Sequence, residues 1–86
     1  MSDLPLCFSL HALDVLHERG ISEEWVRRVV QAPTAVRADS VDPSLVHALA
    51  PIAERDGRVL RVVYNREVEP IRVVTAFFDR TMREKL

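Results

Sequence analysis

Glycine and cysteine are both scarce in this chain of 86 residues. Gly20 and Gly57 are the only glycines, so a glycine-rich loop that cradles a phosphate is excluded. Cys7 has no second cysteine to pair with, which excludes an internal disulfide and is typical of the reducing cytoplasm. We therefore expect a cytoplasmic protein in which Cys7 is a small buried hydrophobe.

Long hydrophobic runs and metal-ligand spacings are also absent. No run approaches the roughly 18 apolar residues of a transmembrane helix, so no membrane association is expected. The start, MSDLPLCF, lacks the basic and long apolar regions of a secretory signal. The three histidines, at positions 11, 17 and 47, do not have the spacing of a zinc site. We expect no metal and no other cofactor.

Lysine is nearly absent, and charge is distributed unevenly along the chain. The net charge is −1, which is not typical of a nucleic-acid-binding protein. Residues 1–54 carry four arginines and eight acids, and residues 55–86 carry eight cations and five acids. Eleven of the twelve cations are arginine, whose planar fork suits phosphate and carboxylate, although GC-rich coding also explains the bias.

Two helices are predicted in the first third of the chain. Ser9 is a good N-cap and Gly20 a good left-handed stop, which predicts a helix over 10–19. Ser22 and the acids after it begin a second helix over 22–32. The predicted apolar faces comprise Leu10, Ala12, Leu13 and Leu16 in the first helix, and Trp25, Val26, Val29 and Val30 in the second.

The remainder of the chain favours strands. Residues 34–39 predict a short strand, and residues 59–64 and 71–78 predict two longer ones. Residues 45–54 predict a further strand, which Pro51 assigns to an edge or a bulge. The sequence therefore predicts a single α+β domain over residues 1–86, with two N-terminal helices packed on a three- to four-stranded antiparallel sheet. The polar tail after the last strand is expected to be a short helical or frayed end.

The register of the two longer strands decides which side chains share a face. If Tyr64 lies opposite Ile71, the face that packs on the helices and covers Trp25 includes Thr75 and Phe77. The other face then brings Arg61 and Arg72 together with Phe78. Two neighbouring cations repel each other, so this pair is expected to bind a shared anion or an acidic neighbour.

His11 and Arg61 are the first candidates for chemistry. The positive end of the helix dipole at His11 favours the neutral imidazole that a general base needs, whereas Asp14 opposes this effect. The simpler interpretation is a surface histidine. Arg61 interrupts an apolar strand, and its simpler interpretation is an ion pair with Glu54.

Weaker signals come from other polar residues. Thr75 breaks an apolar face, and a satisfied buried hydroxyl explains it; Arg80 follows the last strand, where a solvated charge is ordinary. His47 is interpreted as a half-buried structural residue, like His17. Arg19, just before Gly20, is expected to bond the last carbonyls of its helix.

Several short motifs in a fixed order resemble a bacterial family of small proteins of unknown function, over roughly residues 8–80. That family is similar to the RelE and BrnT toxins, which are ribonucleases of toxin–antitoxin pairs. The motifs are His11-Ala12, Arg19-Gly20-Ile21-Ser22, Pro33, Gly57, Leu60, Val62-Val63-Tyr64 and Val73-Val74-Thr75-Ala76.

The resemblance implies a RelE/BrnT-like fold with a sheet face open to RNA, and metal-independent cleavage by attack of the ribose 2′-OH on the adjacent phosphate. His11 would be a base or a phosphate contact, Arg61 and Arg80 phosphate clamps, and Thr75 a positioning group. The implied partners are RNA or the ribosome and a small antitoxin protein. The chain departs from BrnT-like proteins where Phe77 replaces an arginine and where the C-terminal tyrosine is missing. The alternative is a non-catalytic protein-binding module on the same scaffold, favoured by an exposed Phe78.

Overall fold

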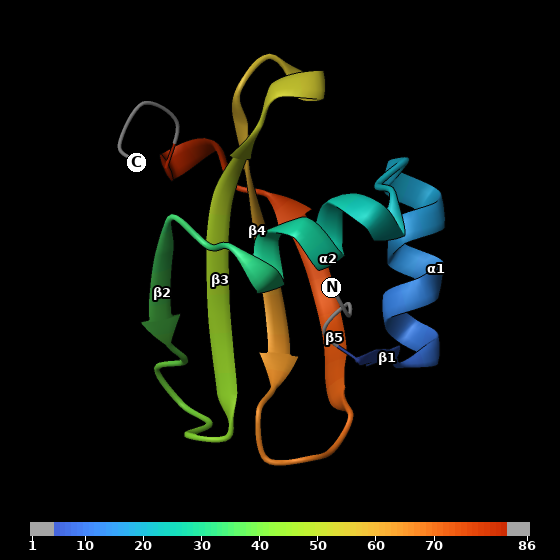
Figure 1. The fold of residues 1–86 in the computed structure, drawn as a ribbon, viewed down its shortest axis with the longest axis vertical. Helices are drawn as coiled ribbons and strands as arrows, with labels where there is room; N and C mark the ends of the chain where they lie inside the picture. Colours follow the sequence, from blue (N-terminus) through green and yellow to red (C-terminus); the bar gives the residue numbers. More distant parts are fainter. Residues whose placement is uncertain (1–4, 83–86) are drawn as a thin grey trace.

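A computed structural model describes residues 5–82 as one mixed sheet with two helices (Figure 1). The sheet order is β1-β5-β4-β3-β2, with β1 parallel to β5 and all other neighbours antiparallel. No helix among these residues is long and apolar enough to cross a membrane. The elements are β1 (Leu6–Phe8), α1 (Leu10–Arg19), α2 (Glu23–Gln31), β2 (Ala35–Ala38), β3 (Leu45–Ile52), the 3₁₀ turn η1 (Ala53–Arg55), β4 (Arg58–Asn65), β5 (Ile71–Phe78) and the 3₁₀ turn η2 (Arg80–Met82).

The helix boundaries follow the predicted caps. The Ser9 hydroxyl accepts the backbone N–H of Ala12 at 3.0 Å, and the Ser22 hydroxyl accepts that of Glu24 at 3.0 Å. Gly20 ends α1 with φ at 63°, a conformation that glycine adopts without strain. These local signals therefore confirm both predicted helices to within one residue at each end.

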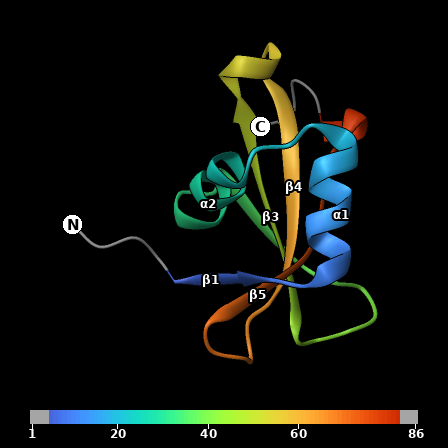
Figure 2. The same ribbon diagram turned by 90° about the vertical axis from the view of Figure 1, so that its right-hand side faces the viewer.

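The predicted apolar face of α1 is wrong in part. Leu10 is 83% exposed and Leu13 is 39% exposed. The buried side chains are Ala12, Val15 and Leu16, because α1 lies along β5 at one side of the sheet and contacts it with that stripe (Figure 2).

The main core lies between the two helices and one face of the sheet. The helix α2 crosses β3 and β4, while α1 packs on β5 (Figures 1 and 2). Trp25 packs against this core but is only half-buried, with its ring edge-on to Phe78 at 6.3 Å between centroids. The buried core residues are Ala12, Leu16, Ile21, Val26, Val29, Val30, Ala48, Ala50, Ile52, Leu60, Val62, Val73 and Ala76.

The assignment of residues 45–54 to an edge or a bulge is wrong, because β3 is an interior strand between β2 and β4. Pro51 is tolerated for a geometric reason. The Leu49 carbonyl points toward β2, where it accepts the N–H of Thr34 at 2.8 Å, so Pro51, two residues further, also faces that side. β2 begins opposite Leu49, so no neighbouring strand needs the N–H that Pro51 lacks.

The predicted three- to four-stranded antiparallel sheet is also corrected, since the sheet has five strands and one parallel pair. The additional strand β1 was missed because three residues are too few to show alternation. Its partner β5 is distant in the chain, so no hairpin signal marks the pair. The short turn η2 agrees with the expected helical end, and residues 83–86 of that tail, like residues 1–4, lie outside the described residues.

A bulge in β5 overturns the predicted register. Val63 pairs with Thr75, but Tyr64 pairs with Val73, so Val74 is an extra residue in β5. From Thr75 onward each side chain therefore points to the opposite face from the one predicted. Ala76 and Phe78 pack toward the helices, and Thr75 and Phe77 lie on the other face. Arg61 lies opposite Phe77 and Arg72 opposite Asn65, so these arginines are not neighbours.

Candidate functional site

A continuous chain of polar side chains crosses the sheet face that points away from the helices. Arg61 Nε donates to Asp79 Oδ2 at 2.9 Å, and Arg61 Nη2 lies 2.8 Å from the same oxygen. Arg61 Nη1 lies 2.9 Å from His47 Nδ1, and His47 Nε2 lies 2.8 Å from Asp39 Oδ1. The side chains are between 11% and 21% exposed, so this four-residue network links the end of β2 to the end of β5.

The chemistry of arginine fixes the direction of these hydrogen bonds. A guanidinium can only donate, so His47 Nδ1 accepts and the ring carries its hydrogen on Nε2, which donates to Asp39. Arg61 thus uses Nε, Nη1 and Nη2 within the protein. The sequence expectation of an Arg61–Glu54 ion pair is wrong, because Glu54 instead binds Arg28 through two contacts of 2.9 and 3.0 Å.

Both carboxylates of the network are stabilised in the charged form. The backbone N–H of Asp42, the His47 ring and the backbone N–H of Val41 lower the pKa of Asp39 to about 2. The Thr81 hydroxyl, and after it Arg61, lower the pKa of Asp79. These hydrogen bonds make the network a fixed part of the fold.

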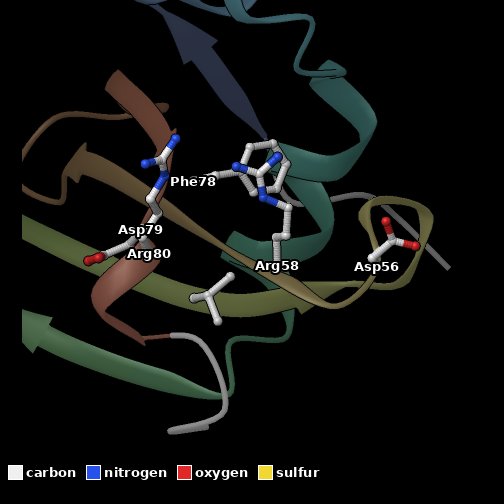
Figure 3. A pocket seen from close by; sticks show the side chains of 6 residues that line it. Asp56, Arg58, Phe78, Asp79 and Arg80 are labelled. Carbon is white, nitrogen blue, oxygen red and sulfur yellow. The ribbon is translucent and has the colours of Figure 1, made fainter.

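Asp79 connects this network to a pocket. Its Oδ1 accepts the Thr81 hydroxyl at 2.6 Å and the Thr81 backbone N–H at 2.9 Å, which holds the turn η2 at the end of β5. The residue between them, Arg80, lines a pocket of about 420 Å³ at the ends of β4 and β5 (Figure 3). The complete lining is Asp56, Arg58, Val59, Phe78, Asp79 and Arg80.

The pocket carries two arginines that have no carboxylate partner among the described residues. Within residues 5–82, neither Arg58 nor Arg80 forms an ion pair, whereas Asp79 is occupied by Arg61 and Thr81. Figure 3 shows the guanidinium groups of Arg58 and Arg80 rising on the same side of the pocket, with the carboxylates of Asp79 and Asp56 directed to either side. Guanidinium groups in this arrangement favour an external anion.

Three of the four predicted site residues lie on or near this part of the molecule. Arg80 lines the pocket, and Arg61 lies one contact away through Asp79. Thr75 lies opposite Val63 on the same sheet face as Arg61, in the diagonal position across the strand pair. Arg61 and Arg80 are therefore connected through Asp79, which Arg61 contacts and which directly precedes Arg80, and not through a ligand that both would bind.

His11 is the predicted site residue that the structure does not bring to the others. It is exposed near the start of α1, where the Ser9 N–H donates to the Val73 carbonyl at 3.0 Å. The far end of α1 is the end near the pocket, since Arg19 Nη1 donates to the Ala76 carbonyl at 2.8 Å. Eight residues of helix, or about 12 Å along its axis, separate His11 from Arg19.

Sequence reasoning selected neither the other members of the network, Asp39, His47 and Asp79, nor Asp56 and Arg58 of the pocket. A signal for His47 was present, because pairing residues 45–52 with 58–65 around the Asp56-Gly57 turn sets His47 opposite Val63, diagonal to Arg61. The prediction that Pro51 belongs to an edge or a bulge obscured that pairing. Arg58 directly follows the turn, where a solvated charge is the ordinary expectation.

No group of three or more His, Cys, Asp or Glu side chains within residues 5–82 has the geometry to hold a metal ion.

Comparison with known proteins gave one family match, to a domain of unknown function, DUF4258, over residues 8–78. No curated protein and no solved structure matches the chain. Since the matched region spans both helices, the strands β2 to β5 and the last residue of β1, the chain belongs to the DUF4258 family.

Proposed function

We propose that this protein is a toxin-like, metal-independent ribonuclease. RNA would be cleaved in the pocket at the ends of β4 and β5. The observation that carries the proposal is the presence of Arg58 and Arg80 in one pocket, with no carboxylate partner in the described part of the chain. A phosphodiester supplies the missing negative charge and matches the planar donors of a guanidinium.

The reaction would be an attack of the ribose 2′-oxygen on the adjacent phosphorus. The bond to the 5′-oxygen of the next nucleotide breaks, and that oxygen takes a proton from water, which leaves a 2′,3′-cyclic phosphate and a 5′-hydroxyl. Negative charge accumulates on the phosphate oxygens in the transition state, and Arg58 and Arg80 would neutralise it. Asp56 supplies a carboxylate in the same pocket that can accept the 2′-OH proton.

The resemblance to RelE and BrnT toxins supports the same chemistry. It implies metal-independent cleavage, RNA or the ribosome as target, and a small antitoxin as partner. The assignment of Arg80 as a phosphate clamp is kept, and Arg58 joins it. Arg61 becomes a residue that holds Asp79, because its Nε, Nη1 and Nη2 atoms each already have a partner within the protein.

The test is cleavage of labelled single-stranded RNA by the purified protein in EDTA, with and without ribosomes, alongside growth arrest on expression. We expect cleavage by the wild type and strong losses in Arg58→Ala and Arg80→Ala. Arg72→Ala, which removes an exposed arginine of β5 outside the pocket, is the matched control. Absence of cleavage under both conditions, with no growth arrest, would reject the enzyme.

His11→Ala tests the original assignment of the base. The distance of His11 from the pocket favours full activity in this variant, whereas loss of cleavage with the fold intact would make His11 the base and move the active site to the start of α1.

A non-catalytic protein-binding module on the same scaffold is the second candidate. Phe78 no longer supports it, because this ring packs toward the helices against Trp25. The supporting observation is instead the outermost strand β2, on which Val36 is 51% exposed. An edge strand can pair with a strand of another protein, so this function would be supported if the wild type cleaves no RNA and a Val36→Lys variant loses a partner that the wild type binds.

A further inference from the structure

Arg58 and Phe78, which line the pocket, belong to a stack of arginine and aromatic side chains. The Arg58 Cζ lies 5.3 Å from the Phe78 ring centroid. The Arg55 Cζ lies 5.6 Å from the same centroid and 5.4 Å from that of Trp25. Arg55 is fixed further by its Nη2, which donates to the Gly20 carbonyl at 3.0 Å. The stack is therefore held in place before any ligand arrives.

Arg58 is the layer of this stack that meets the pocket. One side of its guanidinium lies over Phe78, and the side chain also lines the pocket of about 420 Å³ (Figure 3). That volume is within the range of small-ligand sites, about 300–1,000 Å³. The guanidinium plane thus has one face occupied by a ring and another turned to an open, ligand-sized space.

We propose that the free face of Arg58 stacks on an unpaired nucleobase while Arg80 binds the adjacent phosphate, which makes single-stranded RNA the substrate class. This inference rests on the proposed function and specifies its substrate. Arginine planes and aromatic rings stack on bases that are splayed out of a strand. In a duplex each base face is already covered by its neighbours, so a single stacking layer has nothing to bind.

The position of Phe78 explains why an arginine provides the platform. The ring of Phe78 already has Arg55 and Arg58 over it and the ring of Trp25 beside it at an interplanar angle of 69°. A base therefore meets Arg58 first. Both the charge and the planar shape of the Arg58 guanidinium contribute, because the charge attracts the phosphate backbone and the plane contacts the base.

The test separates these two contributions with Arg58→Lys, which keeps the charge and removes the plane. Binding is measured by fluorescence anisotropy with 2′-O-methyl RNA, whose blocked oxygen cannot attack, and with an oligomer of equal length and charge that lacks bases. We expect the wild type to bind the base-containing strand roughly 5- to 150-fold more tightly than the abasic strand. Arg58→Lys should lose most of that ratio and keep its affinity for the abasic strand.

Two further variants complete the design. Arg80→Ala should weaken binding of both strands by a similar factor, and Arg72→Lys should change neither. A ratio retained in Arg58→Lys, or a duplex bound as tightly as the single strand, would overturn the proposal. If the ratio behaves as expected but no RNA is cleaved, the ribonuclease proposal fails while the base-stacking site stands.

Discussion

Arg58 and Arg61 lie three residues apart on the same strand, yet they meet opposite surroundings. Arg61 donates hydrogen bonds to Asp79 and His47 in a half-buried network. Arg58 lies over Phe78 and has no ion pair among residues 5–82. An arginine that interrupts an apolar strand is thus a structural residue here, while the arginine beside a turn is the one available to a ligand.

The largest effect that tests this comparison is expected for Arg80→Ala. Removing a preorganised donor to a developing charge typically costs about 10²–10³ in rate, and we expect a loss of that size in RNA cleavage. The melting temperature should stay within about 2–4 °C of wild type, because Arg80 is exposed and lacks an ion pair in the described part of the chain. A cleavage rate equal to that of Arg72→Ala would contradict the assignment.

Arg61→Ala should have the opposite signature, a loss of stability. It leaves the Asp79 carboxylate, only 11% exposed, without its cation, and a stranded buried acceptor costs about 1–3 kcal/mol. Urea unfolding followed by Trp25 fluorescence measures this directly. A variant as stable as wild type but unable to bind RNA would show that Arg61 is a ligand contact after all.

The contrast between Arg58 and Arg61 also marks what the sequence could predict. The helix ends at Ser9 and Gly20 follow from local backbone preferences, so the sequence predicts them. The extra residue Val74 in β5 depends on packing across the sheet and has no local signal. That bulge decides the face of Thr75, so a prediction without it could not place the open sheet face correctly.

The same limit explains the candidate site. Arg80 and Arg61 stand out in the sequence as cations next to apolar strands, which makes both of them candidates for the site. The partners of Arg61 could not be predicted. Asp79 and His47 come to it from the two strands beside β4, so predicting these contacts requires the register of all three strands.

As the pH falls, we expect the network of Asp39, His47, Arg61 and Asp79 to be weakened before the pocket arginines are affected. The folded-state pKa values of Asp39 and Asp79 lie below the unfolded value of about 3.9, so both groups stabilise the fold above pH 4. That stability is lost as the pH falls from about 4 through the folded pKa, which for Asp39 is about 2. We expect Asp39→Asn to melt below wild type at pH 7 and the difference to narrow toward pH 2. A constant difference across this range would exclude the role of the Asp39 carboxylate.

The smallest expected effect concerns Arg19, an arginine that is satisfied by backbone instead of a carboxylate. The parallel strand β1 ends opposite Val73, so the Ala76 carbonyl further along β5 has no strand beside it, and Arg19 Nη1 donates to it at 2.8 Å. This replaces the predicted bond to the last carbonyls of α1. Arg19→Ala should cost about 0.5–1.5 kcal/mol, the usual net value of one hydrogen bond, while Arg72→Ala should stay within about 0.5 kcal/mol. Arg19→Lys should recover part of the loss because an ammonium group can also donate to a carbonyl. Equal unfolding free energies for Arg19→Ala and Arg72→Ala would mean that the edge of β5 does not need this donor.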